Sequence, residues 1–163
     1  MELRTDKIRA CFDRKIGNFT ELWNLSTNTN YVRCAPRDPL IELYGLKNGE
    51  RVKLSGHISD VAEAPDALIL SYDSFGEYDI SAKVTCRCEQ DRLVFSAEIC
   101  NHSTIDVTEI LMPHLGGIYL GNGQKDYLIY PHHAGDKTED PVYNYAENRM
   151  TFWRGCSVPF EDI

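Results

Sequence analysis

The sequence predicts an all-β fold, an antiparallel β-sandwich, and three observations lead to this prediction. Short stretches alternate between apolar and polar residues, which is the period of two expected of a strand with one buried face. Glycine, proline and asparagine separate these stretches at short intervals, as turn residues do. No segment carries the apolar period of a helix longer than two turns. Many short strands joined by tight turns are typical of sandwiches and barrels.

The opening segment predicts a β-hairpin. Residues 8–12 and 19–23 both alternate, and the polar residues 13–18 between them form a turn. Gly17 supplies the backbone angle that such a turn requires. The sequence therefore predicts two antiparallel strands here, with Phe12 and Phe19 at the ends that face the turn.

The next segments are shorter and broken by prolines. Residues 31–34 and 40–44 are predicted as short strands, and the Asn-Gly pair at 48–49 predicts a tight turn before a strand at 51–54. Residues 60–65 favour one helical turn that ends at their proline.

The middle of the chain predicts a long meander, which is the strongest secondary-structure signal in the sequence. One stretch alternates over its whole length, and a polar turn at 89–91 returns the chain alongside it. The predicted strands of this region are residues 67–72, 78–88, 93–100, 107–112 and 118–120. Residues 136–141 are predicted as a polar loop, and the last residues show no clear pattern.

Length and charge set limits on the function. The 163 residues are enough for one domain, predicted to span residues 1–163 either as a whole protein or as part of a longer one. The net charge of −8 argues against nucleic-acid and membrane partners, because both carry negative charge themselves. No secretory signal or membrane-length apolar run is visible, so the cytoplasm is the default expectation.

The six cysteines are predicted to be buried free thiols in a reducing compartment. Cys86 and Cys88 share one face of a predicted strand. Their spacing differs from that of a zinc ribbon, and the sequence has no second closely spaced cysteine pair to complete the four ligands of such a site.

The most specific stretch runs from Ile99 to Gly135. Two apolar strands meet near Pro113, a glycine-rich corner follows, and a further strand ends in the run Tyr-Pro-His-His-Ala-Gly at 130–135. With the opening hairpin, this order resembles the N-terminal β-sandwich of large bacterial glycoside hydrolases, a domain related to the galactose-mutarotase supersandwich. The resemblance implies a shortened supersandwich that supports a neighbouring catalytic barrel, whereas the catalytic carboxylates belong to the barrel.

A non-catalytic, carbohydrate-associated module is therefore the leading functional hypothesis, and its expected partners are a carbohydrate or a neighbouring barrel domain. No cofactor is expected. Sugar binding needs aromatic faces and a few polar groups. The candidate carbohydrate-binding residues are Asp126, Tyr130, His132, His133 and Trp153. For Tyr130 and Trp153, a position in the apolar core is the favoured interpretation over sugar binding.

Two alternatives from other functional classes remain open. A small mutarotase-like epimerase would pair a histidine acid, His102 or His114, with a glutamate base, for which only Glu161 in the tail is available. A structural sandwich would form a homo-oligomer through its edge strands. A metal site is not predicted, because the adjacent His132 and His133 point to opposite faces of a strand.

Overall fold

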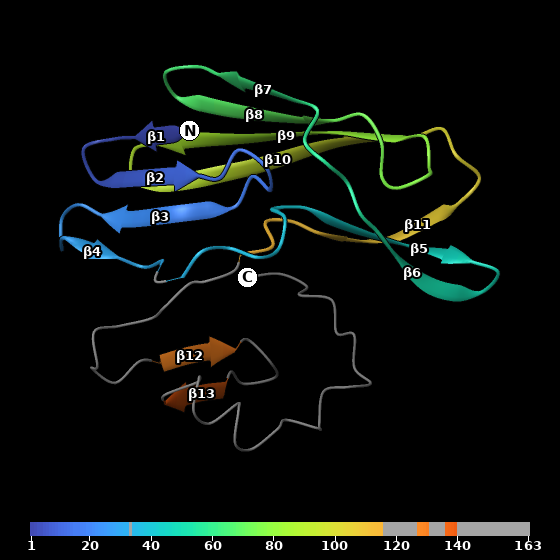
Figure 1. The fold of residues 1–163 in the computed structure, drawn as a ribbon. Coiled ribbons are helices and arrows are strands. Elements are labelled where there is room, and N and C mark those ends of the chain that lie inside the picture. The colour runs from blue at the N-terminus through green and yellow to red at the C-terminus, as the bar shows by residue number, and fades with distance from the viewer. Residues whose placement is uncertain (33, 116–126, 131–135, 140–163) are drawn as a thin grey trace. The chain divides into compact units, whose positions relative to one another are not determined.

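The computed structural model describes residues 1–32, 34–115, 127–130 and 136–139 (Figure 1). The chain divides into two compact units, residues 1–119 and 120–163, and each is described by itself. Strands β1 to β11 belong to the first unit, and the pair β12 and β13 belongs to the second. No helix occurs among the described residues.

The first sheet is built around the predicted opening hairpin. Its strand order is β1-β2-β3-β4, and all neighbours are antiparallel. Gly17 has a φ of +72° in the turn between β2 and β3, as the sequence predicts. The strands are β1 (Glu2–Arg4), β2 (Ile8–Phe12), β3 (Phe19–Asn24) and β4 (Thr29–Asn30).

The second sheet contains the predicted meander. Its order is β10-β9-β8-β7, and β9 and β10 pair over ten residues each. Buried and more exposed residues alternate along β9, which explains the period of two in its sequence. The strands are β7 (Asp60–Glu63), β8 (Ala67–Tyr72), β9 (Ile80–Glu89) and β10 (Arg92–Asn101).

A third sheet of the first unit has the order β11-β5-β6. Its members are β5 (Glu42–Lys47), β6 (Glu50–Leu54) and β11 (Asp106–Leu111). Asn48 and Gly49 both have positive φ, 54° and 82°, in the tight turn that joins β5 to β6. In the second unit, β12 (Tyr127–Tyr130) pairs antiparallel with β13 (Asp136–Glu139).

One apolar core joins the three sheets of the first unit. Phe19 from the first sheet, Leu43 from the third and Val84 from the second are each at most 1 % exposed. Burying side chains of this size contributes about 1.5–3 kcal/mol each. The fold is therefore all-β, with antiparallel sheets packed on a shared core as in a β-sandwich, and the predicted fold class is confirmed.

Three local predictions are wrong. Residues 60–65 do not form a helical turn, because residues 60–63 pair with β8 as the edge strand β7. Residues 136–139 form β13 rather than a loop. Of the predicted strand at 31–34, the described residues 31, 32 and 34 do not form a strand: Val32 makes an isolated bridge, and the short strand β4 ends at Asn30. In each case pairing with a neighbouring strand decides the structure, and local sequence gives only a weak signal of such pairing.

Asn18 fixes the start of β3 to two distant segments. Its side chain is fully buried, and its Nδ2 donates to the carbonyls of Asp38 at 2.9 Å and His114 at 2.8 Å. Its Oδ1 accepts from the backbone N–H of Phe19 at 2.9 Å. A buried polar side chain is stable only when it is paired in this way. Asn18 thereby positions the residues that border both of the sites described below.

Candidate functional site: an aromatic groove

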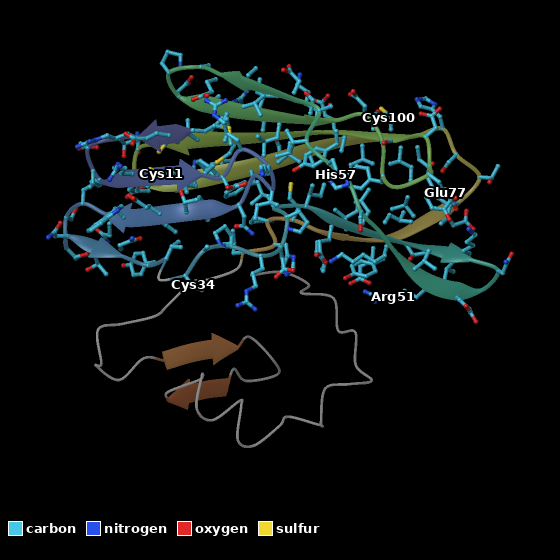
Figure 2. All side chains as sticks on the ribbon, viewed as in Figure 1. Cys11, Cys34, Arg51, His57, Glu77 and Cys100 are labelled. Carbon is cyan, nitrogen blue, oxygen red and sulfur yellow. The ribbon has the colours of Figure 1, made fainter. Side chains whose placement is uncertain are left out.

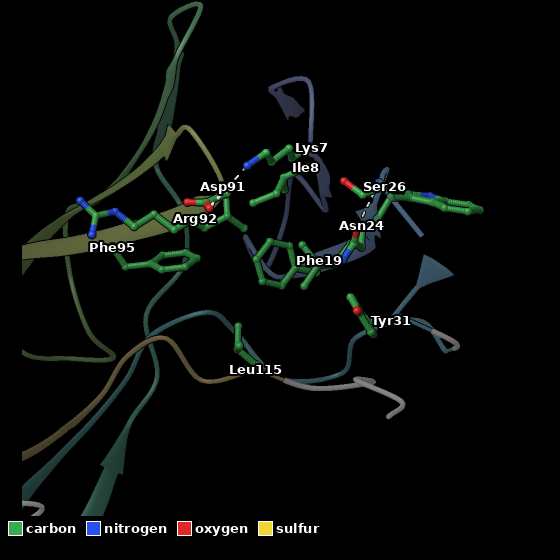
Figure 3. A pocket seen from close by; sticks show the side chains of 13 residues that line it. Lys7, Ile8, Phe19, Asn24, Ser26, Tyr31, Asp91, Arg92, Phe95 and Leu115 are labelled. Carbon is green, nitrogen blue, oxygen red and sulfur yellow. Dashed lines mark hydrogen bonds and ion pairs between the residues drawn. The ribbon is translucent and has the colours of Figure 1, made fainter. Parts of the chain in front are cut away.

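A groove of about 440 Å³ lies where the hairpin of β2 and β3 meets the turn between β9 and β10 (Figure 3). This volume is within the range of small-molecule sites. We call it the aromatic groove. Its aromatic members are Phe19, Trp23, Tyr31 and Phe95, and its polar members are Lys7, Asn24, Ser26, Asp91 and Arg92.

The base of the aromatic groove consists of closely packed aromatic rings. Phe19 is 1 % exposed, and its ring meets Phe95 edge-on with 6.1 Å between ring centroids. On its other side, Phe19 packs against Phe12 at 4.8 Å. Such aromatic pairs contribute about 0.5–1.5 kcal/mol beyond the area they bury. Figure 3 shows Phe19 in the middle of the lining side chains.

The upper part of the groove is more accessible. Trp23 and Tyr31 are half-buried, and the indole Nε1 of Trp23 donates to Glu21 Oε2 at 2.8 Å. This hydrogen bond restrains the indole and leaves part of the ring exposed. Asn24 Oδ1 accepts from the backbone N–H groups of Ser26 at 3.0 Å and Thr27 at 3.2 Å. The turn after β3 therefore has a defined shape.

A charged pair borders the groove at the turn between β9 and β10. Lys7 Nζ lies 3.7 Å from Asp91 Oδ2, and both side chains are more than half exposed. An exposed pair of this length contributes little to stability. Both groups therefore keep hydrogen-bonding capacity for a polar ligand.

A second concentration of polar groups surrounds Glu42 on β5, and we call it the Glu42 cluster. Glu42 is 3 % exposed, and its carboxylate accepts from Lys53 Nζ on β6 and from Tyr44 Oη at 2.9 Å. His114 Nδ1 lies 3.5 Å from Glu42 Oε1. Burial alone would raise the pKa of Glu42, but the hydrogen bonds from Lys53 and Tyr44 and the nearby charge of Lys53 lower it below the ordinary value.

The Glu42 cluster extends to Arg51 on the same sheet (Figure 2). The Arg51 guanidinium lies 3.6 Å from the centre of the Tyr44 ring and 2.8 Å from Glu109 Oε2. The hydrogen bond from Arg51 to Glu109 raises the pKa of Arg51 further above its ordinary value. The charges of Glu42, Lys53, Arg51 and Glu109 are therefore already paired, whereas His114 Nδ1 is buried without a hydrogen-bond partner among the described residues.

The residues predicted to bind carbohydrate cannot be placed. Asp126, His132, His133 and Trp153 lie outside the described residues, as does Glu161. Tyr130 is the last residue of β12, and its side chain is outside the described part of the structure. The predicted set therefore stays a prediction.

The aromatic groove was not predicted from the sequence. Trp23 and Phe19 are recognisable as hairpin residues, but the pattern does not show that β10 brings Phe95 to the same place. Glu42 did carry a signal, because it is an acid between the apolar residues Ile41 and Leu43 of a predicted strand. Its partner Lys53 lies on the neighbouring strand β6 in register with Tyr44, so it is diagonal to Glu42.

The prediction of buried free cysteines is confirmed only in part. All five described cysteines are free, and Cys86 and Cys88 are buried on one face of β9, as predicted. Burial raises the pKa of Cys86 to about 12, so this thiol is unreactive. Cys34 and Cys100 are exposed and Cys11 is half-buried, which corrects the prediction that every cysteine is buried. Cys100 is exposed because it lies near the end of the edge strand β10.

The described residues contain no group of three or more histidine, cysteine or acidic side chains that could hold a metal ion. Within the same part of the chain, no helix is long and apolar enough to cross a membrane. No protein-family model, curated protein or solved structure matches this chain.

Proposed function

We propose that this chain is a non-catalytic carbohydrate-binding β-sandwich module that works beside the catalytic domain of a glycoside hydrolase. The aromatic groove is the binding site in this proposal. The observation that carries it is the combination of four aromatic side chains with hydrogen-bonding groups around one cavity of about 440 Å³. The resemblance to sandwich domains of bacterial glycoside hydrolases supports the same class of ligand.

The physical fit to a sugar is twofold. The apolar face of a sugar ring packs on an aromatic face, and Trp23 and Tyr31 are exposed enough to offer one. The hydroxyls of the sugar need donors and acceptors, which Lys7, Asp91 and Asn24 supply. A neutral sugar is also compatible with a net charge of −8.

The groove favours binding over hydrolysis. Glycoside hydrolysis ordinarily uses two carboxyl groups on either side of the scissile bond. Asp91 is the carboxylate among the described lining residues, and it is paired with Lys7. A catalytic pair would have to come from elsewhere, as the proposed neighbouring domain would provide.

Single-tryptophan variants test this proposal, because the chain has two tryptophans. Trp153→Phe leaves Trp23 as the reporter in the aromatic groove, and Trp23→Phe leaves Trp153 as the reporter. Both variants are titrated with a panel of neutral oligosaccharides while tryptophan fluorescence is recorded. We expect a saturable change in Trp153→Phe and a smaller or absent change in Trp23→Phe, which lacks the reporter in the groove. A flat response in both proteins contradicts the proposal, and a response of Trp153 alone moves the site to the residues predicted from sequence.

A sugar epimerase is the second candidate, and one observation favours it. His114 lies 3.5 Å from Glu42, so a histidine and a glutamate are close together without any contribution from Glu161. Optical rotation of fresh α-glucose or α-galactose measures this activity. The epimerase hypothesis predicts acceleration above buffer that Glu42→Gln abolishes. A rate equal to that of buffer rejects it and leaves the binding proposal unaffected.

A further inference from the structure

A second pocket, of about 220 Å³, lies beside Glu42 and Lys53, and we call it the basic pocket. It is formed by the turn before β3, by residues 37–42 and by the segment that follows β6, where His57 lies (Figure 2). Its cationic or titratable donors are Lys15, Arg37, Lys53 and His57. The volume is below the usual range for drug-sized ligands, so the pocket suits a molecule of few atoms.

The basic pocket has the opposite charge to the protein as a whole. Lys15, Arg37 and Lys53 contribute three positive charges, whereas Asp38 and Glu42 contribute two negative ones, which leaves +1 with His57 neutral. The net charge of the chain is −8. Lys53 is engaged with Glu42, but Lys15 and Arg37 form no ion pair with any residue that the structure describes.

A buried hydroxyl without a partner provides independent evidence for a ligand. Tyr72 lines the basic pocket, is 2 % exposed, and its Oη has no hydrogen-bond partner among the described residues. A Cβ added to Gly17 would lie 3.5 Å from this oxygen, so the hydroxyl lies at the turn that carries Lys15 and Ile16. Burial raises the pKa of Tyr72 to about 12, so the group is a hydrogen-bond donor at neutral pH. An unpaired buried donor is costly to the folded state.

We propose that the basic pocket binds the carboxylate of a small organic monoanion. Arg37 and Lys15 supply the positive charge, and the Tyr72 hydroxyl donates to a carboxylate oxygen. A net charge of +1 matches one negative charge, and the planar guanidinium suits the planar carboxylate. Inorganic phosphate, which is tetrahedral and carries on average between one and two negative charges at neutral pH, would be matched less well. This site is separate from the aromatic groove, and neither proposal requires the other.

Amide NMR titration of the full chain with acetate, lactate and inorganic phosphate, at constant ionic strength, tests the proposal. We expect acetate and lactate to shift the amides of Ser55, Gly56 and His57 saturably, and phosphate to bind more weakly. Tyr72→Phe removes only the hydroxyl, and Arg37→Gln removes an exposed charge. Each should weaken the carboxylate affinity about tenfold, as the loss of a hydrogen bond to a charged group does.

The matched control is Lys47→Gln, which removes a lysine that pairs with Glu77 outside the basic pocket. It should leave the carboxylate affinity unchanged, and Trp23→Phe should do the same, which separates this site from the aromatic groove. Amide spectra of Tyr72→Phe and Arg37→Gln confirm that both variants fold. Absence of saturable shifts, a carboxylate affinity equal to that of the wild type in Tyr72→Phe or in Arg37→Gln, or tighter binding of phosphate than of carboxylates would each overturn the proposal.

Discussion

The aromatic groove and the Glu42 cluster lie in the same unit, but they are held together by different forces. The groove rests on packed aromatic rings, with the buried Phe19 in contact with Phe12 and Phe95, and its charged side chains are exposed. In the Glu42 cluster, by contrast, the carboxylates are already occupied by Lys53, Tyr44 and Arg51. A surface with accessible rings and exposed polar groups is suited to a ligand, whereas a cluster whose carboxylates are already bound is suited to fixing strands. This difference is the reason for placing the sugar in the groove.

The largest expected effect on stability is at Phe19, at the base of the aromatic groove. Phe19→Ala should lower the free energy of unfolding by about 3–5 kcal/mol, because it leaves a cavity below the groove. Trp23→Ala is the matched control, since the half-buried indole loses less packing. Urea denaturation of both variants measures the difference. Equal losses would mean that Trp23 is a core residue, and its assignment as a binding surface would be wrong.

The Glu42 cluster is tested by Glu42→Gln, which removes a charge and keeps the shape of the side chain. We expect a loss of about 1.5–3 kcal/mol in the free energy of unfolding at neutral pH, the usual contribution of hydrogen bonds to a charged group. Glu77→Gln is the control, because Glu77 also pairs with a lysine but is exposed. Its loss should be below about 1 kcal/mol.

The contribution of Glu42 to the free energy of unfolding depends on pH in a defined direction. The pKa of Glu42 in the folded protein is lower than its ordinary value of 4.5. The contribution of Glu42 is therefore complete above pH 4.5 and is lost as the pH falls through the folded pKa. The stability difference between the wild type and Glu42→Gln should shrink in acid. A difference that stays constant from pH 7 to pH 3 would show that the Glu42 charge is not stabilised in the cluster.

The smallest expected effect concerns Arg51 at the exposed side of the cluster. Arg51→Ala removes an exposed ion pair with Glu109 and a cation–π contact with Tyr44. We expect a loss of about 1 kcal/mol or less in thermal or urea unfolding. A loss as large as that of Glu42→Gln would mean that Arg51 and Glu42 act as one cooperative unit, and a double-mutant cycle would then measure their coupling.

The sequence predicts the fold class because local rules act strongly in this chain. The tight turn at Asn48 and Gly49, the hairpin around Gly17 and the alternation along β9 all carry their structure in neighbouring residues. Residues 60–63 and 136–139 do not, since their strands exist only through pairing with β8 and β12. The likeness to the galactose-mutarotase supersandwich stays a prediction.

The candidate sites were harder to predict for a similar reason. The aromatic groove joins Phe19 and Phe95, which are 76 positions apart, through the packing of two sheets. The basic pocket depends on Asn18, which fixes residues near 38 and 114 beside the start of β3. Contacts of this kind leave no period in the sequence.

The position of the sugar site in the aromatic groove is tested by an amide NMR titration of the full chain with a neutral oligosaccharide that binds in the fluorescence assay. We expect shifts concentrated in β3, in the turn after it and in the turn between β9 and β10, with little change at Glu42 and its neighbours. Shifts confined to residues 126–133, or spread evenly over the chain, would contradict this position.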